Sequence, residues 1–253
     1  MLSIINRMLP DFGVTYGPVG RGPFPGLIVL HGSEGGWAGW SHRIAMFFAA
    51  HGFLTYAHAY SKGGNPWNAG SISEVPLDDT VLALNALRGL PECSGKVGIY
   101  GASRGAEHAL LVTSLMARDG MAGLPEAVAV HSPADVICGA FDAATCRESG
   151  DPGWQAWDPG ARAWCWRGSS QGLKPTTPIE IERYAGPLFL SHGVLDQMWS
   201  VEMTRRLEAR LRPRLAPLEV HYYEGEGHIC MNESENEHNR LLLAFFNQHL
   251  RNR

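Results

Sequence analysis

The sequence predicts an α/β fold in which a mostly parallel central sheet is flanked by helices. Apolar, strand-like runs alternate with helix-like segments along most of the chain, and this alternation is typical of parallel sheets. The 253 residues suit one fairly large domain of this class or two small ones, and a hydrophobic fraction of 45% supplies enough apolar material for a sizeable core. We therefore interpret residues 1–253 as a single domain.

The first half of the chain begins this alternation with the apolar run Leu27–His31, which a glycine-containing turn follows. A helical pattern then ends near Gly52. Asp78 and Asp79 mark the start of a later helix, where carboxylates interact favourably with the helix dipole. Lys96–Tyr100 is a short strand that leads through a turn into a strongly apolar helix. We expect strands over 27–31, 53–59, 96–100 and 127–130, and helices over about 41–50, 77–90 and 106–116.

The alternation stops between about residues 135 and 185, where several tryptophans stand among Gly, Pro and Ser with little periodicity. These are Trp154, Trp157, Trp164 and Trp166. Loops of this length inside a compact domain are usually functional or carry elements of their own. We interpret the stretch as a cap-like excursion. Regular alternation resumes beyond it, with strands expected over 187–192 and 218–223 and helices over 201–211 and 235–250.

Charge and cysteine usage argue against several classes of protein. The net charge of −4 is spread along the chain without a basic run, so we expect no nucleic-acid partner. Residues 1–10 lack the apolar core of a signal peptide, and no apolar stretch approaches the roughly 20 residues of a membrane helix. The 5 cysteines are irregularly spaced without C-x-x-C, which indicates neither a disulfide framework nor a zinc site; a Cys146–Cys165 pair is the alternative. We expect a cytoplasmic protein without metal or cofactor.

The pentapeptide G-x-S-x-G occurs twice, at 101–105 and at 168–172. Between a strand and a helix it forms a sharp turn that exposes the serine hydroxyl, and its glycines avoid collisions across that turn. Ser103 has a strand-like run before it and a helix-like run after it. Ser170 has neither, so a flexible polar loop is the better interpretation there. We therefore expect Ser103 to be a nucleophile.

A serine hydroxyl needs a base to accept its proton, and that base is usually a histidine. His228 follows the strand-like run 218–223 in a glycine-containing loop, at the carboxyl edge of the sheet where such loops build sites. The rivals near other strand ends are His31, His58, His131 and His192. We expect His31 to shape the first turn, and His192 to pack or hydrogen-bond near the loop of the acid.

An acid must orient the histidine, and in a strand-turn-helix arrangement of this kind the chain order is nucleophile, acid, histidine. Asp196, just past the strand-like run 187–192, is the best candidate, because the strand adjacent to that of the histidine usually supplies the acid. Asp135, after the preceding strand, is its rival. The alternative role for either aspartate is to cap a helix or stabilise a turn.

Acyl transfer also requires N–H donors for an oxyanion. One donor should be the backbone N–H of Arg104, directly after the nucleophile. The other should come from Ser33, with Glu34 as an alternative, in the turn after the first strand, where glycines allow close approach. Glu34, Trp199 and Met198 are candidates for contacting the substrate. For the tryptophans, packing of the excursion onto the sheet is an equally good interpretation.

Further motifs surround these candidates. They are GPFPG at 22–26, GASRGAE at 101–107, IERYAGP at 181–187, LDQMW at 195–199 and GEGH at 225–228. Together they resemble the C-terminal catalytic domain of the acyl-CoA thioesterase and bile acid-CoA:amino acid N-acyltransferase family, and more distantly dienelactone hydrolase-like proteins, over about residues 20–250. The resemblance implies an α/β-hydrolase fold and places the nucleophile, acid and base on Ser103, Asp196 and His228.

We expect a serine hydrolase that cleaves a small carboxylic ester or acyl thioester through an acyl-enzyme on Ser103. A serine nucleophile favours hydrolysis over acyl transfer. In the family that this sequence resembles, some members, particularly those that conjugate amino acids, use cysteine as the nucleophile. Transfer of the acyl group to an amine or alcohol is the alternative reaction. A catalytically silent fold that binds a ligand is the alternative from another class, since one fold hosts many functions.

Overall fold

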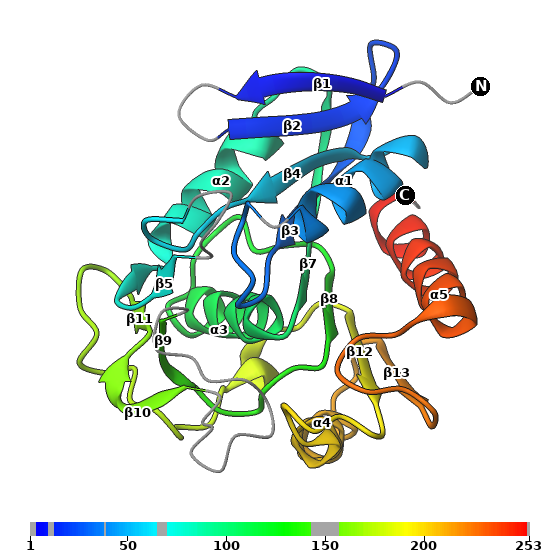
Figure 1. Cartoon of the computed structure of the whole chain (residues 1–253). Helices are drawn as coiled ribbons and strands as arrows, with labels where there is room; N and C mark the ends of the chain where they lie inside the picture. Colours follow the sequence, from blue (N-terminus) through cyan, green and yellow to red (C-terminus); the bar gives the residue numbers. More distant parts are fainter. Residues whose placement is uncertain (1–3, 10–12, 38, 65–69, 143–156, 252–253) are drawn as a thin grey trace.

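The structure is a computed structural model that describes residues 4–9, 13–37, 39–64, 70–142 and 157–251. A central sheet runs through the molecule (Figure 1). Its strands are β1 (Ile4–Leu9), β2 (Gly13–Pro18), β3 (Phe24–Leu30), β4 (Leu54–His58), β7 (Cys93–Ala102), β8 (Val128–His131), β12 (Leu188–Gly193) and β13 (Leu218–Tyr223). The helices are α1 (Trp40–Ala50), α2 (Asp78–Arg88), α3 (Arg104–Arg118), α4 (Val201–Leu211) and α5 (Asn232–Arg251).

The sheet has eight strands in the order β1-β2-β4-β3-β7-β8-β12-β13. The strands from β4 to β13 in this order pair in parallel, whereas β2 pairs antiparallel with both β1 and β4. The predicted mostly parallel sheet flanked by helices is therefore confirmed. The hairpin of β1 and β2 was not predicted, because it adds no helix and so breaks the alternation on which the sequence argument rested.

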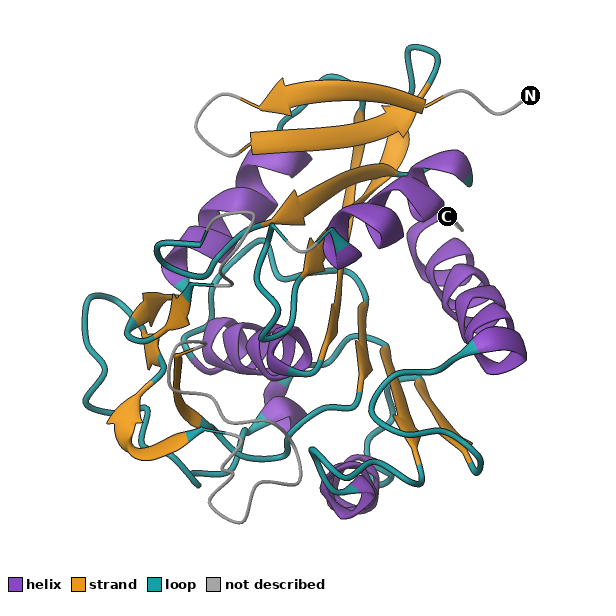
Figure 2. Cartoon of the chain, in the orientation of Figure 1, coloured by secondary structure: helices purple, strands orange, loops and turns teal. Residues whose placement is uncertain are grey.

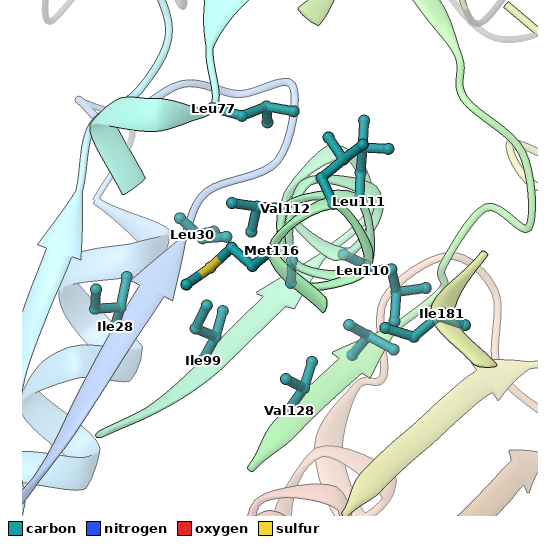
Figure 3. Packing of buried hydrophobic residues seen from close by; sticks show 14 of the residues in the cluster. Ile28, Leu30, Leu77, Ile99, Leu110, Leu111, Val112, Met116, Val128 and Ile181 are labelled. Atoms are coloured by element: carbon teal, nitrogen blue, oxygen red, sulfur yellow. The ribbon is translucent and has the colours of Figure 1, made fainter. Parts of the chain in front are cut away.

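Helices cover both faces of the sheet (Figure 2), and β3 shows why. Side chains of a strand alternate between the two faces. Leu27 and Val29 pack with residues of α1 and α5, whereas Ile28 and Leu30 pack with residues of α2 and α3. Figure 3 shows the second of these layers, with the side chains of α3 lying over the strands. A strand buried on both faces is apolar throughout, which explains the uninterrupted apolar run in the sequence.

The predicted elements after β2 are all present, with shifted ends. The strand before Ser103 begins at Cys93, which is earlier than predicted, and α3 extends the predicted helix at both ends. The limits of α4 and β13 match the prediction. Within the described residues, no helix is long and apolar enough to cross a membrane.

The excursion carries short elements of its own. These are β9 (Gly139–Asp142), β10 (Asp158–Arg162), β11 (Trp164–Cys165) and a 3₁₀ helix (Ile181–Arg183). Of these, β9 pairs with β10 and with β5 (Ser71–Ile72), and β11 pairs with β6 (Val75–Pro76). Trp164 and Trp166 are buried in the core beneath α2 and α3, so they pack the excursion onto the domain. Trp154 and Cys146 lie outside the described residues.

Several buried histidines are distributed over the core elements. Desolvation lowers the pKa of His31 to about 4, and those of His58 and His238 to about 3. Burial also holds the pKa of His108 and of His131 well below the usual value. These imidazoles are therefore neutral in the folded protein.

This burial predicts an acid-sensitive fold. Below about pH 6.5 the unfolded chain binds protons at these histidines while the folded chain does not, so stability falls as the pH falls. Each of His31, His58 and His238 contributes a slope of about 1.4 kcal/mol per pH unit between about pH 6.5 and its own folded pKa. Burial raises the pKa of Glu34 and Glu107. These two groups make the folded state more stable as the pH falls, but they are fewer than the buried histidines.

Urea unfolding at a series of pH values measures this effect. We expect the free energy of unfolding to fall by several kcal/mol, on the order of the summed slopes, between about pH 7 and pH 5. A free energy that stays constant over this range would contradict the burial of neutral histidines.

Candidate active site

The candidate residues gather at the carboxyl edge of the sheet. The turn that begins at Gly32 follows β3, Ser103 follows β7, Asp196 follows β12 and His228 follows β13. The chain moves from β3 to β4 on one side and then returns to β7 on the other, so the strand order reverses between β3 and β7. Crevices at such reversal points are where open α/β sheets bind their ligands.

Ser103 stands in a strained turn between β7 and α3. Its backbone has φ 54° and ψ −122°, which non-glycine residues rarely adopt. A Cβ on Gly105 would lie 2.4 Å from the carbonyl oxygen of Leu30, and one on Gly101 would lie 2.2 Å from that of Gly105. Both glycines of the pentapeptide are thus required by close backbone approach, which is the physical basis of the predicted turn.

A buried ion pair holds the first turn of α3. The guanidinium of Arg104 lies 3.0 Å from the carboxylate of Glu107 and donates to the carbonyl of Gly139 at 2.9 Å. Glu107 also accepts hydrogen bonds from the indole of Trp164 and the backbone N–H of Cys138, both at 2.7 Å. Burial raises the pKa of Glu107, and the charge of Arg104 opposes that rise. These contacts tie the turn of Ser103 to the excursion.

Asp196 and His228 lie in hydrogen-bond contact, as the chain order predicted. The Nδ1 of His228 donates to Oδ2 of Asp196 at 2.7 Å. The other carboxylate oxygen, Oδ1, accepts the backbone N–H groups of Met198 at 2.8 Å and Trp199 at 2.9 Å. The Asp-Gln-Met-Trp stretch therefore forms a tight turn that fixes the carboxylate with its own backbone.

His192 also hydrogen-bonds to the carboxylate of Asp196. Its Nε2–H donates to Oδ2 of Asp196 at 3.0 Å and to the carbonyl of Trp199 at 2.9 Å, while its Nδ1 accepts from the hydroxyl of Thr204 at 2.7 Å. The expectation that His192 would hydrogen-bond near the acid loop is confirmed. It was not predicted that His192 and His228 would share one carboxylate oxygen.

The protonation states follow from these partners. Burial tends to raise the pKa of Asp196, but the hydrogen bonds from His192 and His228 outweigh it, and the pKa lies below its usual range. An ionised carboxylate only accepts hydrogen bonds, so the Nδ1 of His228 carries a proton, and in the neutral imidazole the lone pair is then on Nε2. That Nε2 is buried and has no hydrogen-bond partner among the described residues. It is ready to accept a proton.

Ser103 and His228 line one cavity of about 230 Å³, together with Ser33, Glu34, Trp40 and Met198. The N–H groups of Arg104 and Ser33 have no acceptor within the part of the chain that the structure describes. The carboxylate of Glu34 accepts the N–H of Gly32 at 2.9 Å, and burial raises its pKa.

Of the two roles left open for Trp199, the structure supports packing over contact with substrate. Trp199 is only 3% exposed and is absent from the described residues that line the cavity. Its ring packs against that of Trp157 at a centroid distance of 5.9 Å. Its backbone, which contacts Asp196 and His192, links it to the site instead. Met198 does line the cavity.

The rival residues are engaged elsewhere. Asp135 receives two hydrogen bonds from Arg206, at 2.6 and 2.8 Å. The Nδ1 of His31 donates to the carbonyl of Gly32, and its Nε2 accepts the N–H of Tyr60, so His31 shapes the first turn as predicted. Ser170 of the second pentapeptide donates to the carboxylate of Glu74 at 3.1 Å.

Comparison with known proteins finds relatives in sequence. Residues 64–253 match the model of the prolyl oligopeptidase family. Over 101 residues the chain is 37% identical to acyl-coenzyme A thioesterase 6 of Mus musculus, a match that covers 39% of this chain and 23% of the mouse protein. The chain thus matches less than a quarter of the length of that relative.

Solved structures share the fold over almost the whole chain. A candidate dienelactone hydrolase from Klebsiella pneumoniae has a TM-score of 0.67 at 15% identity and covers 98% of this chain and 99% of its own. Esterase 2 of Thermogutta terrifontis, phosphonylated by sarin, has a TM-score of 0.64 at 14% identity, with 98% and 94% covered. The expected α/β-hydrolase fold, resembling thioesterases and dienelactone hydrolase-like proteins, is confirmed.

The two pentapeptides allow a matched test of the turn geometry. We expect Gly105→Ala to lower the free energy of unfolding by about 2 kcal/mol or more, because its Cβ collides with the carbonyls of Leu30 and His31. Gly172→Ala should change it by at most about 0.5 kcal/mol, because nothing lies within 4 Å of that Cβ. Urea unfolding of both variants measures the difference. Equal stabilities for the two variants would contradict the close approach at Gly105.

Proposed function

Because the chain belongs to the prolyl oligopeptidase family, we propose that it is a serine hydrolase that cleaves a small carboxylic ester or acyl thioester. The observation that carries this proposal is that His228 lines the same cavity as Ser103 and donates from Nδ1 to Asp196, while its Nε2 has no hydrogen-bond partner among the described residues. The thioesterase relative supports the acyl class of substrate.

In the acylation step, the Nε2 of His228 accepts the proton of the Ser103 hydroxyl while Oγ attacks the acyl carbon. The N–H groups of Arg104 and Ser33 donate to the resulting oxyanion. His228 then gives its proton to the departing alkoxide or thiolate as the bond to the acyl carbon breaks. The products of this step are the alcohol or thiol and an acyl ester on Ser103.

In the second step, His228 accepts a proton from water, and the hydroxide oxygen attacks the acyl carbon. Collapse of the tetrahedral intermediate returns the proton to Ser103 and releases the carboxylic acid. Asp196 stays ionised throughout, since its role is to hold the imidazole and to stabilise its charged form. The backbone N–H groups of Met198 and Trp199, together with His192, keep that carboxylate in place.

The surroundings of the cavity favour a neutral acyl group with an apolar surface. Trp37, Leu195 and Met231 are 60%, 59% and 59% exposed, and they lie on the three loops that carry Ser33, Asp196 and His228. Inside the cavity, the carboxylate of Glu34 places negative charge beside the reacting groups. This charge disfavours anionic acyl groups.

Replacing the nucleophile tests the proposal directly. We expect Ser103→Ala to lower kcat for p-nitrophenyl butyrate by about three orders of magnitude or more, because the substitution removes the Oγ on which the acyl-enzyme forms. Ser170→Ala, in the second copy of the same pentapeptide, should leave kcat within about two-fold of the unchanged protein. Circular dichroism checks that both variants fold. Substantial turnover by Ser103→Ala would refute the assignment.

Glu34→Gln tests the charge selectivity. At about pH 8 we expect the variant to raise kcat/KM for an ester with a terminal carboxylate by about ten-fold, as repulsion of about 1.4 kcal/mol is removed. A neutral ester of equal length serves as the control and should change little. Because burial raises the pKa of Glu34, the discrimination by the unchanged protein should weaken as the pH falls. Selectivity identical in both proteins would show that Glu34 does not set it.

A further inference from the structure

Three side chains from separate elements meet behind the loop that carries His228. His131 ends β8, Cys230 lies in the loop two residues after His228, and His238 lies in the first half of α5; all are at most 4% exposed. Their ligand atoms lie within 4.8 Å of one another. We propose that these residues form a binding site for a divalent ion that favours sulfur and imidazole ligands, with Zn²⁺ as the best match.

The hydrogen bonds of His131 prepare it as a ligand. The hydroxyl of Ser191 donates to the carbonyl of Val130 at 3.3 Å, so its oxygen accepts the Nδ1–H of His131 at 2.9 Å. The Nε2 of His131 is thereby left with a lone pair, and it lies 3.9 Å from Sγ of Cys230. In tetrahedral zinc sites these two ligand atoms stand about 3.6 Å apart. This pair therefore needs only a small closure to bind one ion.

His238 is held in the same manner. Its Nδ1 lies 3.1 Å from the hydroxyl of Tyr223, and its Nε2 lies 3.1 Å from the hydroxyl of Tyr100. Tyr100 also lines the cavity between the three side chains, so Nε2 is the nitrogen on that side. The ion replaces the Tyr100 hydrogen bond, and Nδ1–H donates to Tyr223. Such outer hydrogen bonds are typical of histidines that bind metals.

The cavity between these residues has the size and charge for a single ion. Its volume is about 20 Å³, close to that of one water molecule. Glu235 lines it one helical turn before His238, and at present pairs with Arg43 at 2.5 Å. Glu235 or a water molecule fills the fourth position. With the Cys230 thiolate and the Glu235 carboxylate bound, the two charges of the cation are balanced.

Binding is a ligand exchange without a redox step. The Cys230 thiol loses its proton to solvent as the bond from sulfur to the ion forms, so one proton is released for each ion bound. Cys230 lies two residues after His228, and Ser132, next to His131, donates to the carbonyl of His228 at 3.0 Å. An ion bound to Cys230 and His131 therefore holds the His228 loop both directly and through Ser132. The ion site does not depend on the reaction proposed above.

Titration of the chelator-treated full chain with Co²⁺ tests the site, because a cobalt–thiolate bond gives a charge-transfer band in the near ultraviolet. We expect the band to saturate at one ion per chain and Zn²⁺ to displace it. Cys230→Ser should abolish the band and weaken Zn²⁺ binding by at least about ten-fold. Cys230→Ala serves as a second variant, and circular dichroism confirms that both fold.

Two control variants locate the bound ion. Cys93→Ser changes a half-buried thiol on β7, and His228→Ala removes the histidine of the candidate active site; both should keep the band. The proposal would be overturned if the unchanged protein gave no band. It would also be overturned if the folded Cys230 variants kept the band, or if either control variant lost it.

Discussion

The candidate site depends on the contact between the start of α3 and the end of β3. The backbone of Gly105 approaches the carbonyls of Leu30 and His31 so closely that no side chain fits between them. This approach bends the chain sharply at Ser103, gives that residue a positive φ, and sets its hydroxyl beside the turn that holds Ser33. Because β3 is buried on both faces, the sheet supplies a rigid support for this strain.

Two buried polar networks fix the rest of the site around that contact. One joins Arg104 and Glu107 to Trp164 and the backbone of the excursion, so a segment remote in sequence anchors the nucleophile turn. The other is centred on Asp196, whose two oxygens receive four hydrogen bonds. Buried charges are stable only when they are paired in this way. The networks therefore make the site and the fold interdependent.

The sequence predicted what short-range patterns record. Alternating elements indicated the parallel sheet, and the strand before Ser103 and helix after it separated the two pentapeptides. The order of Ser103, Asp196 and His228 predicted a contact that the structure shows between the latter two. For Trp199 the sequence left both substrate contact and packing open, because adjacency to Asp196 does not reveal which way a ring points; the structure shows packing.

Contacts across long sequence separations were beyond such patterns. The partners of Glu107 come from residues 138 and 164, and the ligands proposed for the ion come from residues 131, 230 and 238. No motif links positions so far apart, and only the folded sheet brings them together. The β1–β2 hairpin was missed for a related reason, since a short antiparallel addition leaves no alternating signal.

Labelling with a fluorophosphonate probe, followed by peptide mapping, shows whether Ser103 is an activated nucleophile, because the probe reacts with activated serine hydroxyls. We expect a single adduct per chain on Ser103, and none on Ser170, although both stand in the same pentapeptide. A folded protein that takes up no probe, or that carries the adduct on another serine, would contradict this expectation.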